Sequence, residues 1–204
     1  MNRILFFAAV YFSLPAATAQ AAVFERDWKT PGDGLLTYDD VNQREWLDLS
    51  ETLLFQFSGD ISDRLAEVID ETAPGGLFAG FSAATAADVM SLSESAGIDT
   101  STNSYAINQA ASNHLIDLLG ATSTFSLTDR RTRGFLSDFP NGVRIVATAS
   151  TEFAGIFDGT ISTDPSGLLF ETGVWLYREA VPEPTTSILL MTGIMFLLCR
   201  RHFS

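Results

Sequence analysis

His114 is the only histidine in the central part of this chain, and its side chain is the one that most readily suggests catalysis or metal binding. A metal site or a general base usually needs neighbouring ligands or a hydrogen-bonded partner. The sequence contains no HExxH pattern, no nucleophile elbow and no glycine loop that could cradle a phosphate. We therefore interpret His114 as a partly buried structural residue, and we expect no cofactor and no catalytic residue.

The carboxylates are the second group that could carry out chemistry. Asp33, Asp39 and Asp40 are close in the sequence, and Asp158 and Asp164 lie in predicted hairpin turns. Aspartate in a turn usually accepts hydrogen bonds from its own backbone, which explains most of these residues. The EF-hand pattern is missing. A bound divalent ion such as calcium and a glycosidase pair of carboxylates both stay open, because both depend on distances in the folded chain.

Arg130, Arg131 and Arg133 form the only basic cluster of the central part. Guanidinium groups bind carboxylates in a forked geometry, so this cluster could hold an anionic polysaccharide. The simpler interpretation, which we favour, is a solvated loop that balances the surrounding acidic charge.

The net charge excludes one class of partner. The two ends contain 3 of the 12 basic and 1 of the 25 acidic residues, which leaves 9 and 24 in residues 23–180 and a net charge of −15 there. Nucleic acids and anionic lipid surfaces bind basic proteins. We therefore expect no nucleic-acid partner, and we interpret the acidity as a feature that keeps an exported protein in solution.

Three segments of residues 23–180 have the apolar periodicity of helices with start and stop signals. They are residues 58–76, 85–98 and 103–120. Thr85 and Asp88 have the spacing of a capping box. The predicted buried stripes are Ile61, Leu65, Val68 and Ile69 in the first segment, Val89, Leu92 and Ala96 in the second, and Ile107, Ala111, Leu115 and Leu118 in the third. The predicted stops are Pro74-Gly75-Gly76, Gly97 and Gly120.

Short segments rich in aromatic and branched residues predict strands on either side of these helices. They are residues 34–40, 45–50, 142–150, 151–159 and 168–179, with turns predicted at Pro140-Asn141-Gly142, Asp158-Gly159 and residues 164–167. This order predicts one α+β domain over residues 23–180, with a mainly antiparallel sheet and about three packed helices. Trp46, Phe135 and Trp175 are the expected core aromatics.

The N-terminal segment, residues 1–22, has the features of a secretory signal peptide. Arg3 is followed by an apolar stretch over residues 4–14 and by small residues around Ala19 and Ala21. The single cysteine, Cys199, lies in the C-terminal tail, so no disulfide framework can hold the central part.

The tail, residues 181–204, combines three features in a fixed order. Pro182-Glu183-Pro184 keeps the chain extended, a 12-residue apolar run follows over residues 188–199, and Arg200-Arg201 comes next. As a helix the run is about 18 Å long, shorter than a hydrocarbon core of about 30 Å. The arginines orient the segment with its C-terminus in the cytoplasm.

These features resemble the PEP-CTERM sorting signal of Gram-negative bacteria. Pro182, Glu183 and Pro184 match the motif, residues 185–199 match the transmembrane helix, and Arg200 and Arg201 match the basic end. The resemblance covers the tail alone. It implies recognition by exosortase, a membrane-embedded cysteine protease that cuts near the motif and passes the protein to the cell surface. An ordinary single-pass anchor would need the apolar run and the arginines but not the prolines.

A second resemblance concerns the central part, which is similar to a domain that recurs in exported proteins with this tail. It rests on Trp46-Leu47-Asp48-Leu49, Gly80-Phe81, Ala84-Thr85 and Trp175-Leu176. The layout also loosely resembles C-type-lectin-like domains, in which the first and last strands pair and the termini meet. The chain departs from that family in having no disulfide and no clear calcium loop, so sugar binding cannot be carried over.

Together these observations predict an exported cell-surface or matrix protein that is sorted by an exosortase. We expect a transient inner-membrane stage through the C-terminal helix, then a cell-surface or extracellular location. The expected role is a noncatalytic biofilm component associated with extracellular polysaccharide. The alternative is a secreted, glycosidase-like hydrolase that uses carboxylates of the acidic central part, residues 23–180, which we call the body.

Overall fold

The computed structural model describes residues 23–55, 63–126, 129–148, 154–160 and 171–181. Residues 1–22 and 182–204, which contain the predicted signal peptide and sorting tail, lie outside them. No helix within the described ranges has the length and hydropathy of a membrane span.

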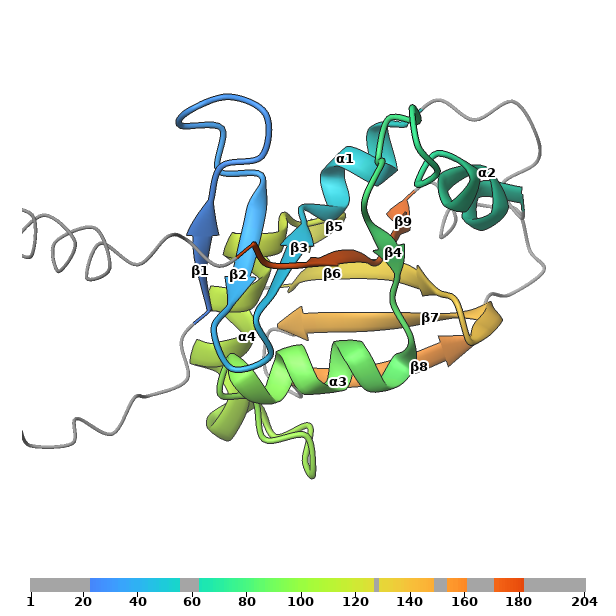
Figure 1. Ribbon diagram of the computed structural model, residues 1–204. Coiled ribbons are helices and arrows are strands. Elements are labelled where there is room, and N and C mark those ends of the chain that lie inside the picture. The colour runs from blue at the N-terminus through green and yellow to red at the C-terminus, as the bar shows by residue number, and fades with distance from the viewer. Residues whose placement is uncertain (1–22, 56–62, 127–128, 149–153, 161–170, 182–204) are drawn as a thin grey trace, which may run out of the picture.

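The described chain is an α+β domain with two sheets and four helices (Figure 1). The first sheet has the order β1-β2-β3-β10-β4 and is antiparallel throughout. Its strands are β1 (Val23–Arg26), β2 (Leu36–Asp39), β3 (Arg44–Leu47), β4 (Ser82–Ala83) and β10 (Leu176–Glu179).

The second sheet has the order β5-β6-β7-β8, and β9 joins β6 as its one parallel strand. Its strands are β5 (Ser123–Ser126), β6 (Asp129–Leu136), β7 (Phe139–Thr148), β8 (Ala154–Thr160) and β9 (Gly173–Val174). Because β9 and β10 are separated by Trp175 alone, one stretch of chain passes from the second sheet to the first.

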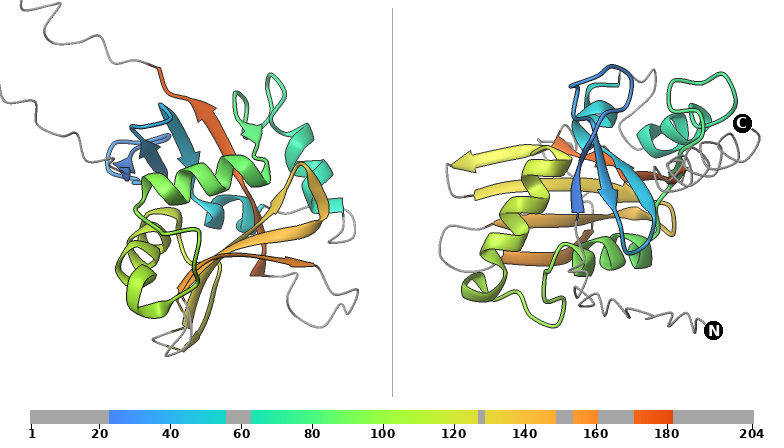
Figure 2. Two further views of the ribbon diagram at one scale, coloured as in Figure 1. Left: turned by 90° about the horizontal axis from the view of Figure 1, so that it is seen from below. Right: turned by 60° about the vertical axis from the view of Figure 1, so that its left-hand side comes forward.

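The helices are α1 (Leu49–Leu54), α2 (Arg64–Asp70), α3 (Ala86–Ser95) and α4 (Tyr105–Leu119). α4 contacts β1 and β2 of one sheet and β6, β7 and β8 of the other, so it fills the space between them (Figure 2). The expected core aromatics are confirmed, since Trp46, Phe135 and Trp175 are at most 2% exposed. Trp46 and Trp175 meet edge to face, with ring centroids 6.2 Å apart.

The α3 prediction is confirmed in detail. The Thr85 hydroxyl accepts from the Asp88 backbone N–H, and the Asp88 carboxylate accepts from the Thr85 N–H. Gly97 and Gly120 follow α3 and α4 with φ of +86° and +76°, a conformation that glycine adopts without steric cost. In α2, Leu65 and Val68 are buried as predicted, whereas Ile69 is exposed.

Several local predictions were wrong. The strand expected over residues 45–50 ends at Leu47, because Asp48 accepts a hydrogen bond from the Ser50 N–H and begins α1, a helix that was not predicted. In α4, Ile107 is 60% exposed and Asn108 is buried in its place. The Asn108 side chain bonds the backbone of Asp99 and Thr102, which fixes this turn of the helix.

Two predicted turns lie inside strands. Residues 140–142 belong to β7, because β6 and β7 turn at Ser137-Asp138, and Asp158-Gly159 belongs to β8, where Asp158 is the Cα partner of Arg144. Gly142, Asp158 and Gly159 have ladder partners, whereas Pro140 and Asn141 lie where the register between β6 and β7 shifts, an irregularity of the kind in which proline is tolerated in a sheet.

The last strand, β10, pairs with β3 and β4, whereas β1 pairs with β2 at the edge of the sheet. The pairing of first and last strands implied by the lectin-like resemblance is therefore not present in this sheet. Even so, Val23, Asp39, Arg44 and Glu179 are consecutive Cα partners across β1, β2, β3 and β10. With strands about 4.8 Å apart, the two ends of the described body lie roughly 14 Å from each other.

Candidate functional site

The sequence-predicted residues do not converge on one site. His114 is exposed, contrary to the expected partial burial, and its Nε2 lies 3.4 Å from the Val23 carbonyl. Asp33 and Asp39 lie at opposite ends of β2, and Asp164 and the sorting-motif residues fall outside the described residues. In the part of the chain that is described, no three His, Cys, Asp or Glu side chains are close enough to hold a metal ion.

The two aspartates are bound to their own turns, as turn chemistry predicts. Asp33 accepts from the backbone N–H groups of residues 28, 29, 30 and 35, and these bonds, that of Trp28 above all, hold its pKa well below the usual range. Asp39 is fully buried and accepts from the N–H groups of Val41 and Asn42 and from the Asn42 side chain. These two carboxylates therefore do not form a glycosidase pair.

The basic cluster lies on β6 and not in a loop. Arg130 forms an ion pair with Asp117 at 2.6 Å, and Arg131 binds Asp129 with two nitrogens, each at 3.0 Å. Arg133 is 3% exposed, and burial, with the nearby Arg131 charge, lowers its pKa. The cluster is thus divided between intramolecular pairs and the interior.

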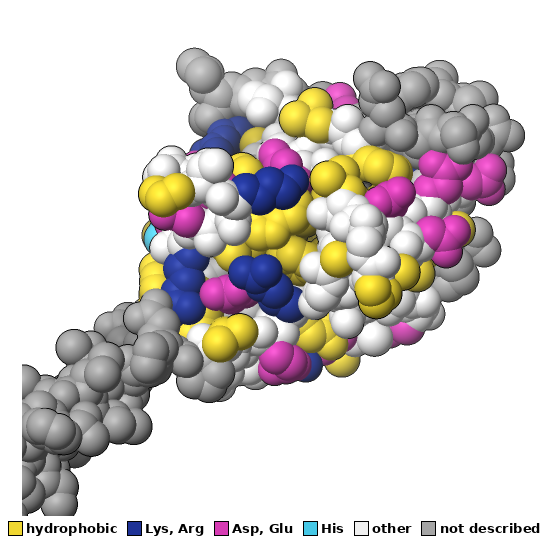
Figure 3. All heavy atoms as spheres, turned by 45° about the horizontal axis from the view of Figure 1, so that its top comes forward, with side chains coloured by type: hydrophobic (Ala, Val, Ile, Leu, Met, Phe, Trp, Pro, Cys, Tyr) yellow, Lys and Arg dark blue, Asp and Glu magenta, His cyan; other side chains and the backbone are white. Residues whose placement is uncertain are grey.

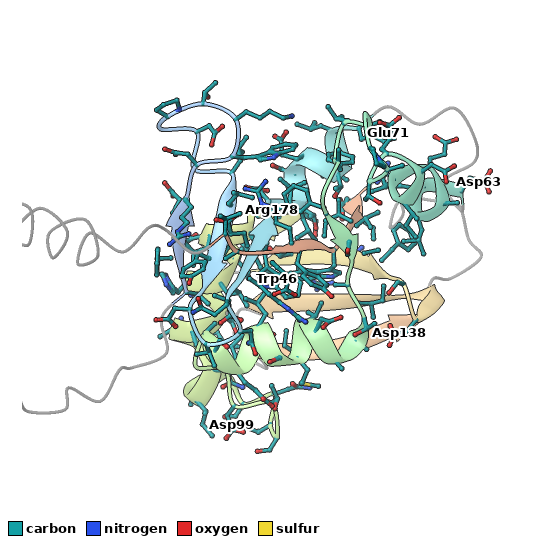
Figure 4. All side chains as sticks on the ribbon, in the orientation of Figure 1. Trp46, Asp63, Glu71, Asp99, Asp138 and Arg178 are labelled. Carbon is teal, nitrogen blue, oxygen red and sulfur yellow. The ribbon has the colours of Figure 1, made fainter. Side chains whose placement is uncertain are left out.

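A different set of cations gathers on the first sheet, on the face turned away from α4. Adjacent residues of a strand point to opposite faces, so Trp46 and Tyr177 pack on one side while their neighbours Glu45 and Arg178 lie on the other. Figure 4 labels Arg178 and Trp46 on opposite sides of β10. Figure 3, which turns the upper side of Figure 1 forward, shows Lys and Arg side chains bordering a hydrophobic patch.

Glu45 is the centre of this arrangement. Its side chain is only 10% exposed, and its two oxygens accept from Arg178 Nε at 2.7 Å and from Arg26 Nη1 at 3.2 Å. A single carboxylate thus positions two guanidinium groups that come from strands 152 residues apart in the chain. The three groups together carry one net positive charge.

Each guanidinium also lies against an aromatic ring. Arg26 is 3.7 Å from the ring centroid of Tyr38, and Arg178 is 5.0 Å from that of Phe81. Phe81 meets Trp28 edge to face at 5.8 Å. These distances fall within the range of cation–π and aromatic pairs.

Lys29 extends the arrangement into the loop between β1 and β2. Its ammonium lies 3.5 Å from the Trp28 ring centroid, and within the described residues it forms no ion pair. Asp33 fixes the backbone of both loop residues through the bonds described above. We call the connected set the aromatic–cation row; it consists of Phe24, Tyr38, Arg26, Arg178, Phe81, Trp28 and Lys29, with Glu45 beneath the two arginines.

Sequence reasoning missed the aromatic–cation row. The segment Arg26-Asp27-Trp28-Lys29 carried a local signal, since two basic residues flank a tryptophan next to a predicted strand. The pairing of Arg178 with Glu45 depends on β10 lying beside β3, which no local pattern reveals.

Comparison with known proteins adds no relative. No family model, curated protein or solved structure matches this chain.

Proposed function

We propose that this protein is exported through residues 1–22 and sorted by an exosortase through its tail. At the cell surface it is a noncatalytic component associated with extracellular polysaccharide. The observation that carries the proposal is the order of features in the tail, where Pro182-Glu183-Pro184, the apolar run and Arg200-Arg201 follow one another.

The fold supports this proposal at one point. Val23 and Glu179 lie in the same row of the first sheet, so both ends of the body leave from one side. That is the useful arrangement for a domain attached to a membrane or surface by its tail, because the opposite side stays free. From the resemblance to C-type-lectin-like domains, the proposal uses only the closeness of the two chain ends; it does not use sugar binding.

The sorting step is tested in a host with and without its exosortase, by the mass and location of the product. We expect a shorter, surface-located product only when the enzyme is present. The double variant Pro182→Ala with Pro184→Ala should abolish processing. A matched variant, Pro31→Ala with Pro74→Ala, changes two exposed loop prolines of the body and should be processed normally. Identical mass and location in both hosts would contradict the proposal.

The noncatalytic, polysaccharide-associated role is tested with a glycan array and an assay for released reducing sugar. We expect binding without release. Release of sugar that depends on a carboxylate of the body would favour the alternative, a secreted hydrolase.

A further inference from the structure

We propose that the aromatic–cation row is the ligand-binding surface of the body, and that its ligand is an acidic polysaccharide whose sugar rings carry carboxylates. This inference rests on the proposed association with polysaccharide and adds the site and the chemical class of the ligand.

The charge of the row points to an anionic ligand. The body carries a net charge of −15, yet Arg26, Arg178 and Lys29 gather on one face, where Glu45 binds both arginines. Exposed cations in so acidic a protein would be expected to pair with its own carboxylates. Lys29 instead lies on Trp28, and Arg178 donates to Glu45 through Nε alone, so its two terminal nitrogens have no hydrogen-bond partner among the described side chains.

The geometry of the row favours carboxylates on a chain of rings. The side chains of Arg26 and Arg178 are 24% and 32% exposed, and Glu45 and the rings beneath hold both in fixed orientations. A fixed guanidinium binds a planar carboxylate with two parallel hydrogen bonds at a small entropic cost. Trp28 is half-buried and Phe24 is 40% exposed, so each end of the row offers an aromatic surface against which the apolar side of a sugar ring can pack.

A lipid or nucleic-acid surface fits less well. A lipid surface, or a nucleic-acid duplex with one charge per about 1.7 Å of its axis, would bring a dense array of like charges against a body with 15 excess negative charges. A polysaccharide with one carboxylate per sugar ring is less densely charged and can contact the row alone.

The test measures binding of the full chain, in detergent, to alginate, a polymer of uronic acids, and to uncharged dextran of similar length. We expect alginate to bind and dextran not to bind. Arg178→Gln and Lys29→Gln should each weaken alginate binding by about tenfold, as expected for loss of one charge-assisted contact. Among the described residues Lys29 forms no ion pair, so Lys29→Gln stays informative even where Arg178→Gln disturbs Glu45.

Arg130→Gln is the matched control, since it removes the same charge from a partly exposed arginine of the second sheet. It should leave alginate affinity unchanged. Equal weakening by Arg130→Gln, or full binding by both row variants, would overturn the assignment of the site. Binding to dextran or to neutral array glycans, with no binding to alginate, would contradict the acidic ligand class but leave the proposed association with polysaccharide in place. Absence of binding to any polysaccharide would contradict the ligand class and the proposed association alike.

Discussion

At the scale of single residues, polar groups in this protein mainly organise backbone. Asp33 and Asp39 each hold a turn, and Asn108 holds the loop before α4. Glu45 differs from them, because its partners are two side chains of other strands. Glu45 therefore positions side chains of the aromatic–cation row, whereas Asp33, Asp39 and Asn108 mainly stabilise the backbone of turns and loops.

Asp33→Asn tests whether the Asp33 carboxylate stabilises the loop that contains Trp28. The pKa of Asp33 is lowered on folding, so its stabilising effect is complete above about pH 4 and is lost as the pH falls through the folded value. We expect the variant to unfold at a lower temperature than the wild type at pH 7, and the difference to shrink below about pH 4. Thermal unfolding from pH 2 to 7 measures this.

The matched control for that measurement is Asp70→Asn, which changes an exposed aspartate at the end of α2. It should unfold at the wild-type temperature at pH 7. A constant difference between Asp33→Asn and wild type at every pH would contradict the assigned role.

At the scale of elements, the sequence predicted most where a signal is local. The capping box of Thr85 and Asp88, and the stops at Gly97 and Gly120, determine α3 and the end of α4 within a few neighbouring residues. α1 was missed because it has six residues, too few for a periodic pattern, and begins at Asp48 inside an apparent strand.

Features that depend on which strands pair could not be predicted from local sequence patterns. Gly142 and Gly159 belong to a turn-forming type, yet both lie in the ladder between β7 and β8 of the second sheet. The basic cluster of β6 was likewise expected in a loop, because the ion pairs of Arg130 and Arg131 depend on the folded position of that strand. For the same reason the aromatic–cation row could not be found from local patterns, since its residues come from β1, β2, β10 and two loops.

Thr85→Ala tests the contribution of the capping box. The hydroxyl satisfies the Asp88 backbone N–H at the start of α3, and losing such a cap costs about 1 kcal/mol. We expect urea unfolding to report a decrease in the free energy of unfolding of that size. Thr100→Ala, whose exposed hydroxyl reaches only Glu94, should cost much less. Equal losses in the two variants would argue against the box as a stabilising feature.

At the scale of the whole molecule, the two sheets are joined by the chain around Trp175. Its N–H donates to the Phe135 carbonyl of the second sheet, and its carbonyl accepts from the Ala84 N–H beside the first. Its ring is fully buried against Trp46. The sheets should therefore lose their structure together and not one after the other.

Trp175→Ala tests this coupling. Removing a fully buried tryptophan costs about 3–5 kcal/mol, and we expect one unfolding transition, at lower denaturant, for probes placed in either sheet. Trp28→Ala changes a half-buried ring and should cost less. Two separate transitions in Trp175→Ala, with one sheet kept at the wild-type midpoint, would contradict a shared core.

The position of the chain ends predicts which side of the body faces away from the tail. The Ala180 N–H donates to the Gln43 carbonyl, so the described body ends beside the β2–β3 turn that carries Val41, while Lys29 follows β1 at the opposite end of the sheet. Both positions are exposed. With the uncut chain held in liposomes by its tail, a bulky maleimide polymer should label Lys29→Cys faster than Val41→Cys. In detergent the two rates should become similar, and the wild type, with Cys199 alone, gives the background. Equal labelling in liposomes would contradict this orientation.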